Sequence, residues 1–395
     1  MPLFLMIFFL LYGVMHLYAF LKARAAFAFG TYIGACVAVF MLVMLFAPVI
    51  IRSSEKAGFE VFARVVSYIG YMWMGTLFLF VSCSLVIDSC RVILHAGGLV
   101  LKKDFSHIAI SERYAFFIPF ALSVLIAVYG YFEAEDIRTE RIMLKSPKIP
   151  AAAGRLRIVQ MSDVHLGLIV REERLKRVLG EVEKAKPDIF VSTGDLVDGQ
   201  INGLSGLSEI LRNINPRYGK FAVTGNHEFY AGLPQALAFT EKAGFKVLRG
   251  EVLDVAGLIN IAGVDDPQVR AYSRVKGVSE TGLLSTISNG KFTLLLKHRP
   301  LIDKSTPGLF DLQLSGHVHK GQIFPFSLIT GMYYHPTQAG LAELPGNAYL
   351  YVSRGSGTWG PPIRFLSPPE VTVIDLVHSD TAADSAGRKA KNESF

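Results

Sequence analysis

The chain has 395 residues, of which 51% are hydrophobic and only 18% are charged, and its formal net charge is +7. A chain of this length can form two domains of ordinary size. Its hydrophobic share is too high for an ordinary soluble protein, so the excess must be concentrated in one part of the chain. The basic residues are scattered and form no stripe with aromatic residues, which argues against nucleic acid binding and favours attraction to anionic lipid.

Four long apolar segments without charged residues lie in the N-terminal part of the chain. They are residues 3–21, 27–51, 65–87 and 114–132. A helix needs about 20 apolar residues to cross the hydrocarbon core of a bilayer, and all four segments are long enough. A cleaved signal peptide is the alternative for the first segment, but it has no basic start and no cleavage site of small residues. We therefore predict a transmembrane domain of four helices over residues 1–133.

The loops between these segments bear on the side of the membrane. Four spans place both ends of the domain on one side, and that side has slightly more Lys and Arg than the other, which leans toward cytoplasmic termini. The three cysteines, Cys36, Cys83 and Cys90, belong to the membrane part, so the soluble part has no disulfide framework and fits either compartment. We expect a multi-pass protein of the cell's inner membrane, with its soluble part leaning to the cytoplasmic side.

After Glu133 the composition changes to alternating strands and helices. Residues 134–154, with prolines at 147 and 150, are interpreted as a linker. Short apolar runs of strand length follow at 156–161, 188–192, 220–224, 258–262, 292–297, 312–315, 348–352 and 371–376. Apolar residues at helical spacing predict helices at 171–185, 204–214 and 234–243. The pattern predicts an α/β domain over residues 155–378 and a polar, disordered tail over 379–395.

Residues that can bind metal follow five of these strands directly. The segments are Ser162–His165, Thr193–Asp198, Gly225–Glu228, His298 and Gly316–His319. Open α/β sheets place their ligands at the carboxyl ends of strands. Residues two apart in an extended segment point the same way, so Asp163 with His165, and His317 with His319, can each offer two ligands to one cluster. Mixed carboxylate and imidazole ligands suit manganese, iron or zinc better than calcium.

The ordered set D-x-H, G-D-x-x-D, G-N-H-E, a lone histidine after a strand and G-H-x-H resembles the calcineurin-like metallophosphoesterase superfamily. The resemblance covers roughly Leu156–Leu376. The later segments Ser353–Thr358 and Pro362–Phe365 look like the bacterial membrane-associated branch, some members of which are UDP-diacylglucosamine pyrophosphatases. The resemblance implies an α/β sandwich of two mixed β-sheets flanked by helices, here preceded by the four-helix transmembrane domain.

The resemblance also implies a ligand set for two divalent metal ions, Mn²⁺ first, with Fe or Zn as alternatives. One ion would be held by Asp163, His165, Asp195 and His319. The other would be held by Asp195, Asn226, His298 and His317, with Asp195 bridging. A metal-bound hydroxide would attack phosphorus in line.

Two further residues have catalytic roles by this resemblance. His227 would stabilise or protonate the leaving oxygen, and Asp198 would orient His227. The phosphoprotein phosphatases of the superfamily carry an Arg after this aspartate, whereas this chain has Gly199, which argues against a phosphoprotein substrate. Asp198 could instead cap a turn, and Glu228 could be a plain hydrogen-bonding residue.

Several other residues keep two interpretations. His335 is interpreted as a loop residue and not as a ligand, and Trp359 either lines a substrate pocket or only packs. Asp88 and Arg91 could form a functional pair inside the membrane, but their place at a span end favours an interfacial position.

Three functions are compatible with this sequence. The first is a membrane-anchored two-metal phosphoesterase that cleaves phosphodiester or pyrophosphate bonds, including those of lipid-linked substrates. The second is a broad-specificity phosphomonoesterase acting on soluble metabolites or nucleotides. The third is a catalytically silent membrane scaffold or sensor, against which the intact ligand set argues. No substrate-binding residues and no protein partners are indicated.

Overall fold

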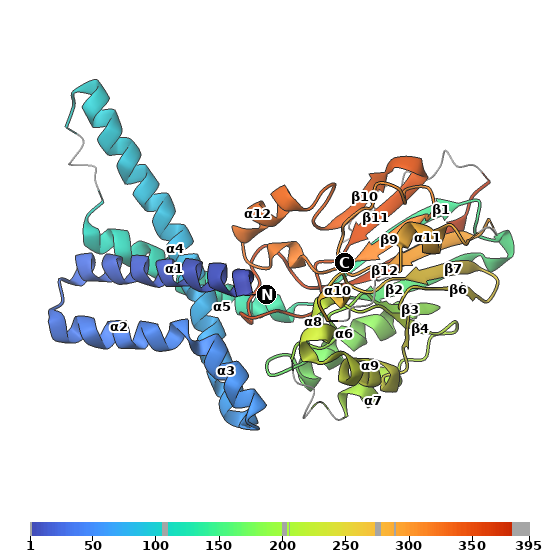
Figure 1. The fold of residues 1–395 in the computed structure, drawn as a ribbon. Coiled ribbons are helices and arrows are strands. Elements are labelled where there is room, and N and C mark those ends of the chain that lie inside the picture. The colour runs from blue at the N-terminus through green and yellow to red at the C-terminus, as the bar shows by residue number, and fades with distance from the viewer. Residues whose placement is uncertain are drawn as a thin grey trace. The chain divides into compact units, whose positions relative to one another are not determined.

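The computed structural model describes residues 2–104, 110–199, 204, 206–272, 278–287 and 290–380 (Figure 1). The chain divides into two compact units. The helical unit comprises Met1–Phe132 and Gly360–Phe365, and the sheet unit comprises Glu133–Trp359 and Leu366–Phe395. Each unit is described by itself below.

The helical unit is built from five helices. They are α1 (Pro2–Phe27), α2 (Thr31–Leu45), α3 (Ala47–Lys56), α4 (Glu60–Leu101) and α5 (Glu112–Glu135), whose last residues belong to the sheet unit. Three of them, α1, α4 and α5, are long and apolar enough to cross a membrane. The second expected span is a pair, α2 and α3, bent by 50° at the break. Pro48 lies in the first turn of α3, where its ring is compatible with a helix start but not with an unbroken helix.

Helix α4 is longer than the expected span over residues 65–87. It has 42 residues, which at 1.5 Å per residue makes a helix of about 63 Å. This is roughly twice the 30 Å thickness of a hydrocarbon core. Part of α4 therefore extends beyond the apolar layer or is strongly tilted within it.

Asp88 and Arg91 belong to a charged network that joins three helices of this unit. Asp88 accepts hydrogen bonds from Lys22 Nζ at 2.6 Å and from the Tyr18 hydroxyl at 2.5 Å. Arg91 pairs with Glu112 on α5 and lies 3.8 Å from Asp88. Charged side chains near a membrane pair with one another in this way. Joining α1, α4 and α5 is a sufficient structural role for both residues.

A segment from far along the chain completes the helical unit. Arg364 N donates a hydrogen bond to Gly130 O at 2.8 Å, and the Phe365 ring lies 6.1 Å from the Tyr129 ring. A Cβ atom on Gly130 would lie 2.6 Å from Arg364 O, so the backbones approach too closely for a larger residue there. The segment Gly360–Phe365 is therefore packed into the apolar helices.

The sheet unit consists of two six-stranded mixed sheets, with the strand orders β1-β12-β2-β3-β4-β5 and β10-β11-β9-β8-β7-β6. The first contains β1 (Arg138–Ser146), β2 (Arg155–Met161), β3 (Ile189–Ser192), β4 (Lys220–Ala222), β5 (Lys246–Val247) and β12 (Glu370–His378). The second contains β6 (Glu251–Val255), β7 (Ile259–Gly263), β8 (Phe292–Leu296), β9 (Leu312–Ser315), β10 (Gly340–Leu344) and β11 (Ala348–Val352). The pairs β2–β12, β10–β11 and β6–β7 are antiparallel and the others are parallel.

Helices flank these sheets, which confirms the expected sandwich, preceded by apolar helices that can span a membrane. The helices are α6 (Glu172–Ala185), α7 (Leu207–Arg212), α8 (Asn226–Ala231), α9 (Leu233–Lys242), α10 (Val269–Tyr272), α11 (Glu280–Leu284) and α12 (Phe326–Tyr333). Short 3₁₀ turns η2 (Ala151–Ala153), η3 (His319–Gly321) and η4 (Pro345–Asn347) complete the unit.

The segment 134–154, expected as a linker, instead contains a strand of the first sheet, β1. Strand β1 pairs in parallel with β12 from Arg138 opposite Glu370 to Ser146 opposite His378. As an edge strand it carries many charged residues, which is usual for strands exposed to water on one side. Because of these charges, the segment contains no apolar run of strand length. The predicted disordered tail lies outside the described residues from 381 onward.

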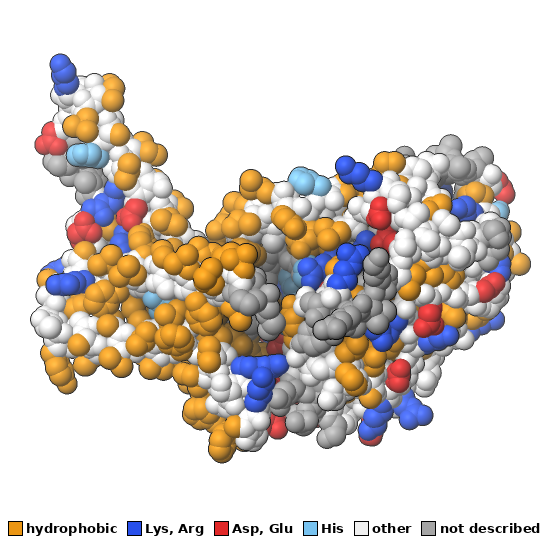
Figure 2. Space-filling model, viewed as in Figure 1, with side chains coloured by type: hydrophobic (Ala, Val, Ile, Leu, Met, Phe, Trp, Pro, Cys, Tyr) orange, Lys and Arg blue, Asp and Glu red, His pale blue; other side chains and the backbone are white. Residues whose placement is uncertain are grey.

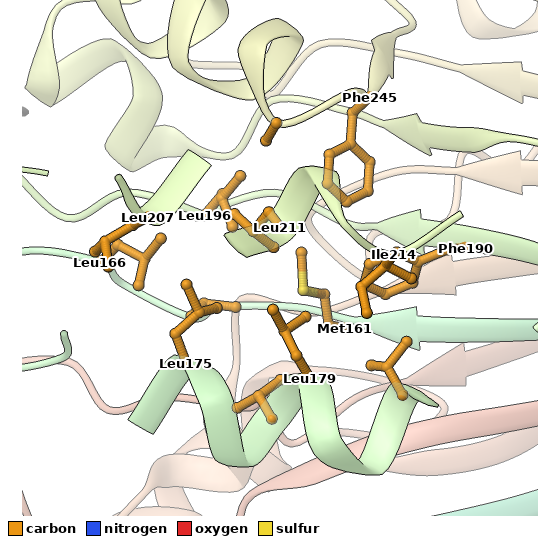
Figure 3. Packing of buried hydrophobic residues seen from close by; sticks show 14 of the residues in the cluster. Met161, Leu166, Leu175, Leu179, Phe190, Leu196, Leu207, Leu211, Ile214 and Phe245 are labelled. Atoms are coloured by element: carbon orange, nitrogen blue, oxygen red, sulfur yellow. The ribbon is translucent and has the colours of Figure 1, made fainter. Parts of the chain in front are cut away.

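Two hydrophobic layers hold the sheet unit together. One fills the space between the sheets, where Ile158 and Val191 of the first sheet pack with Leu294 and Leu312 of the second. The other lies between the first sheet and its helices, where Leu175 and Leu179 of α6 pack with Met161, Phe190 and Leu211 (Figure 3). Burying one such side chain contributes about 1.5–3 kcal/mol. This packing keeps the strand ends at fixed positions.

Candidate metal centre

Five strands bring the predicted ligands to one place. Strands β2, β3 and β4 of the first sheet and β8 and β9 of the second each end shortly before one or more of these residues. The predicted ligands that come together are Asp163, His165, Asp195, His298, His317 and His319, and Asn226 follows β4 at the start of α8. Most of these side chains are buried, so water has little access to their polar atoms.

The first cluster contains Asp163, His165 and His319, whose ligand atoms all lie within 4.8 Å of one another. His165 Nε2 is 3.2 Å from His319 Nε2, and His319 Nε2 is 3.5 Å from Asp163 Oδ1. Asp163 is held in place by the Ser162 hydroxyl and by the backbone N–H of His317, which donate to its carboxylate. This is the group that the resemblance implies for one ion, apart from Asp195.

The second cluster contains Asp195, His298 and His317. His298 Nε2 lies 3.2 Å from Asp195 Oδ2 and 3.1 Å from His317 Nδ1. The other nitrogen of His298, Nδ1, lies 2.8 Å from the carbonyl oxygen of Thr193. A carbonyl at this distance accepts the Nδ1 proton and turns the unprotonated Nε2 toward the cluster, as partners of metal-bound histidines do.

Asp195 lies between the two clusters. Its Oδ2 atom is 3.2 Å from His298 Nε2 in the second cluster and 3.9 Å from His165 Nε2 in the first. A third grouping within 4.8 Å joins His165, Asp195 and His227. A carboxylate in this position can contact ions on both sides.

The chemistry of these donors fits divalent metal ions. Imidazole nitrogens of His165 and His319 lie 3.2 Å apart and those of His298 and His317 lie 3.1 Å apart. A carboxylate oxygen lies within 4.8 Å of each pair. Within the part of the chain that the structure describes, the buried Asn226 Oδ1 has no hydrogen-bond partner. A buried polar atom left unpaired costs about 1–3 kcal/mol, and a cation beside it would offset this cost. Nitrogen and oxygen ligands of this kind suit manganese, iron or zinc.

The ligand-bearing residues have an unusual backbone, which corrects the expectation of extended segments. Five of them are in the left-handed region: Asp163 (φ 52°), His165 (φ 55°), Asp195 (φ 50°), His317 (φ 72°) and His319 (φ 49°). Non-glycine residues adopt this region rarely and at an energetic cost, most often at functional sites. His317 and His319 belong to different clusters, whereas Asp163 and His165 share one.

Glycines make room where the loops meet. A Cβ atom on Gly225 would lie 2.1 Å from Asp195 Oδ1 and 2.6 Å from Asp195 N. A Cβ atom on Gly316 would lie 2.0 Å from Ser162 Oγ and 2.1 Å from Asp163 Oδ2. Each of these glycines therefore lies too close to a candidate ligand carboxylate for a side chain to fit, which explains its place in the motif.

We predict that Gly225→Ala displaces the Asp195 carboxylate, because the added methyl group cannot share its space. The expected result is a lower metal content and a loss of activity on the order of 10–100-fold, as for changes that misplace a ligand. The control is Gly180→Ala in α6, where nothing lies within 4 Å of the added Cβ. Metal analysis and thermal unfolding of both variants test this. Equal metal content in the two variants would contradict the steric explanation.

Glu228 joins two of the loops that carry candidate ligands, a role that the sequence analysis did not assign to it. Its carboxylate accepts hydrogen bonds from the backbone N–H groups of Asp195, Leu196, Val197 and Gly225, at 2.6–3.3 Å. It therefore fixes the loop that carries Asp195 to the loop that carries Asn226. The signal available in the sequence was its place as the third residue of α8, where a glutamate often bonds back to the helix start.

His227 lies beside the clusters and is held by Asp198. Its Nδ1 is 2.9 Å from Asp198 Oδ1, and Asp198 Oδ1 is also 3.4 Å from His165 Nδ1. Burial lowers the pKa of His227, but the carboxylates of Asp195 and Asp198 outweigh this effect and raise the pKa to about 9. Burial also opposes the charge on Asp198, but hydrogen bonds from His165 and His227 lower its pKa.

The same competition acts on the second cluster. Burial lowers the pKa of His298, yet the nearby Asp195 carboxylate raises it to about 10. For His317, burial and then the charge of His298 lower the pKa well below its usual value. A proton and a metal ion compete for the same nitrogens, because only the neutral imidazole can bind a metal.

The remaining sequence candidates have separate places. The Trp359 ring is 6.0 Å and the Tyr230 ring 5.2 Å from the His227 ring, so aromatic side chains border the site at this histidine. Trp359 is half exposed and therefore available to a ligand. His335 is exposed, lies outside the three groupings, and contacts the carbonyl oxygen of Met332.

A two-sheet α/β sandwich with Asp, His and Asn gathered at the strand ends has the architecture of a metallophosphoesterase. The family model described as calcineurin-like phosphoesterase matches residues 156–321. The chain is 40% identical over 255 residues to an uncharacterized metallophosphoesterase of Aquifex aeolicus, covering 65% of this chain and 97% of that protein. It is 31% identical over 337 residues to a metallophosphoesterase of Campylobacter jejuni, covering 81% and 86%.

The chain belongs to the calcineurin-like metallophosphoesterase family, whose members are metal-dependent phosphoester hydrolases. A transmembrane protein with a metallophosphoesterase domain from Danio rerio is 31% identical over 270 residues, covering 65% of this chain and 61% of that protein. With the apolar helices of the helical unit, this likeness indicates a membrane protein.

Proposed function

We propose that this protein is a membrane-anchored phosphoesterase that binds two divalent ions and hydrolyses phosphodiester or pyrophosphate bonds. The observation that carries this proposal is the position of Asp195 between two clusters of buried ligands. One ion would be held by Asp163, His165, Asp195 and His319. The other would be held by Asp195, Asn226, His298 and His317.

Bound ions would supply positive charge to the substrate phosphate and lower the pKa of an attacking water. The protein's own residues would supply the proton and hold the site in place. Asp198 holds Nδ1 of His227, so Nε2 is the atom left to give a proton to the leaving oxygen. The Asp198 carboxylate, 2.9 Å from Nδ1, favours the protonated form of His227 that this role needs. Glu228 keeps the Asp195 loop in register throughout.

Two features support a bulky substrate at a membrane surface. Gly199 follows Asp198 and has no side chain, where phosphoprotein phosphatases carry an Arg, so space is left for a diester or pyrophosphate. The chain also carries its own apolar helices, which would keep the site close to lipid-linked phosphates. An acylated nucleotide sugar is one such substrate. Mn²⁺ is the proposed metal, and the cytoplasmic side is the proposed location of the sheet unit.

Metal dependence is the first test. Full-length protein in nanodiscs, stripped with a chelator, is expected to lose hydrolysis of an aryl phosphodiester and to regain it with Mn²⁺ or Zn²⁺. Binding should approach two ions per chain, because the ligands form two clusters. Metal analysis beside the activity assay checks both points. Full activity in thoroughly stripped protein would refute the proposal.

Substrate class is decided in the same preparation. An acylated and a deacylated nucleotide sugar, an aryl phosphodiester and an aryl phosphomonoester are compared by kcat/KM. A higher value for the acylated compound supports a lipid-linked substrate. A preference for the monoester would support the alternative, a phosphomonoesterase acting on soluble metabolites, because no membrane anchoring is needed for such substrates.

A further inference from the structure

Helix α12 is an apolar helix whose side chains are exposed in the described part of the sheet unit. Its sequence, Phe326 to Tyr333, contains no charged residue, and none of its residues is buried. Its large side chains are exposed: Phe326 44%, Leu328 60%, Ile329 59%, Met332 79% and Tyr333 72%. Figure 2 shows hydrophobic side chains gathered at this place. Single exposed apolar residues are ordinary, but a contiguous patch usually marks an interaction surface.

The opposite side of the helix is attached to the sheet unit. The Thr330 hydroxyl bonds to the Gln338 side chain, and a Cβ atom on Gly331 would lie 2.9 Å from Gln338 Nε2. Helix α12 is therefore held in a fixed orientation, with a polar side toward Gln338 and an apolar side toward the surroundings.

The start of α12 is held where the chain joins the membrane helices. The chain leaves the sheet unit after Trp359, returns at Leu366, and first enters it at Glu133. Gln322, just before α12, exchanges two hydrogen bonds with the Trp359 backbone, at 3.0 and 2.9 Å.

The other two junctions lie at the same edge of the sheet unit. Leu366 N donates to the Glu133 carboxylate at 2.9 Å. The next residue, Ser367, donates through its hydroxyl to His319 O at 2.6 Å. His319 begins η3, which leads through Gln322 into α12. Hydrogen bonds within the sheet unit thus connect all three junctions, at Glu133, Trp359 and Leu366, with the segment that leads into α12.

No long tether separates this edge from the bilayer. Helix α5 can span a membrane and ends at Glu135, and β1 begins at Arg138. Each residue of extended chain adds at most about 3.6 Å, so the sheet unit begins within a few residues of the end of the span. A bilayer is consequently always near this edge, whereas a protein partner would have to be recruited.

We propose that α12 is an interfacial helix, which inserts the exposed side chains of Leu328, Ile329, Met332 and Tyr333 into the bilayer that the apolar helices of the same chain span. This goes beyond the proposed function and does not depend on catalysis. Helices of this kind lie in the plane of the membrane with their apolar side about 5–10 Å deep in the boundary between headgroups and acyl chains. His317 and His319 precede α12 closely, so the metal centre would open near the headgroups.

Spin-label depth measurement tests this in the full-length chain. The native Cys36, Cys83 and Cys90 are replaced by serine, and a nitroxide is attached at Met332→Cys or, separately, at Leu328→Cys. The protein is placed in nanodiscs of phosphatidylcholine and phosphatidylglycerol. The matched control is Val278→Cys, because Val278 is 57% exposed and lies against Gly250, next to β6. Strand β6 is at one edge of the second sheet, and β10, the strand that follows α12, is at the other.

Labels at 332 and 328 are expected to be accessible to oxygen and shielded from a water-soluble nickel chelate, at a depth of about 5–10 Å. The label at 278 should show the reverse. Equal access of the nickel chelate to all three positions would overturn the proposal. Shielding from both reagents, or dipolar broadening between labels, would overturn it in favour of a protein partner or a second copy. Because no turnover is measured, this result is independent of the proposed catalytic activity.

Discussion

An Asp195→Asn variant is expected to lose both metal ions together, and with them phosphoester hydrolysis. The asparagine side chain has the same shape as aspartate. It also keeps the oxygen that accepts a hydrogen bond from the backbone N–H of His227 at 2.8 Å, so the loop should keep its fold. What the variant removes is the negative charge between the two clusters. Loss of activity should exceed the roughly 10–100-fold effect of changing an outer partner of a metal ligand.

Metal content after dialysis and kcat/KM are measured on the full-length variant in nanodiscs. Asp254→Asn is the matched control, because Asp254 pairs with Lys291 at the exposed end of a surface strand and not with a ligand. That control should keep its metal and its activity, since an exposed ion pair contributes little. Two tightly bound ions in Asp195→Asn would show that Asp195 does not bridge them.

A His227→Ala variant is expected to lower kcat by about 10²–10⁴-fold, the usual contribution of a general acid. Its metal content should remain near that of the parent protein, because both proposed ligand sets are complete without this residue. Leaving groups that need no proton should be affected less than those that do. A series of aryl substrates with graded leaving-group pKa values measures this difference.

The control for this variant is His378→Ala, at the end of β12. Strand β12 runs antiparallel to β2, so its last residue, His378, lies beside the start of β2. The metal centre lies at the other end of β2. His227 also lies within 4.8 Å of His165 and Asp195, so ligation is a real alternative for it. Loss of an ion from His227→Ala, with a parallel loss for every leaving group, would make His227 a ligand.

The candidate metal ligands could be selected from the sequence because their residue types occur in short motifs. Each motif directly follows an apolar run of strand length, and parallel strands bring their carboxyl ends to one edge. The backbone conformation of these residues differs from the one expected. Asp163, His165, His317 and His319 were expected in extended segments, but all four have left-handed backbones. Residues other than glycine adopt that conformation rarely, so their identity in a four-residue motif did not indicate it.

The missed strand β1 has a similar explanation. Its only apolar residues are the three of Ile142–Leu144, between charged residues on both sides, and its pairing partner β12 lies more than 200 positions later in the chain. Pairing over such a distance leaves no local trace in composition. A soluble fragment that starts at Ala151 would therefore lack an edge strand of the first sheet.

By itself, the sequence determined the kinds of atoms that can bind metal, their order along the chain, and the apolar segments that can enter a membrane. These properties belong to single residues and to short runs, so they need no partner. The tertiary structure alone decided which ligands share a cluster, how Glu228 joins two loops, and that Gly360–Phe365 packs with α5. It also decided that large apolar side chains of α12 are exposed among the described residues. Each of these outcomes depends on contacts between residues far apart in the chain, and such contacts exist only after folding.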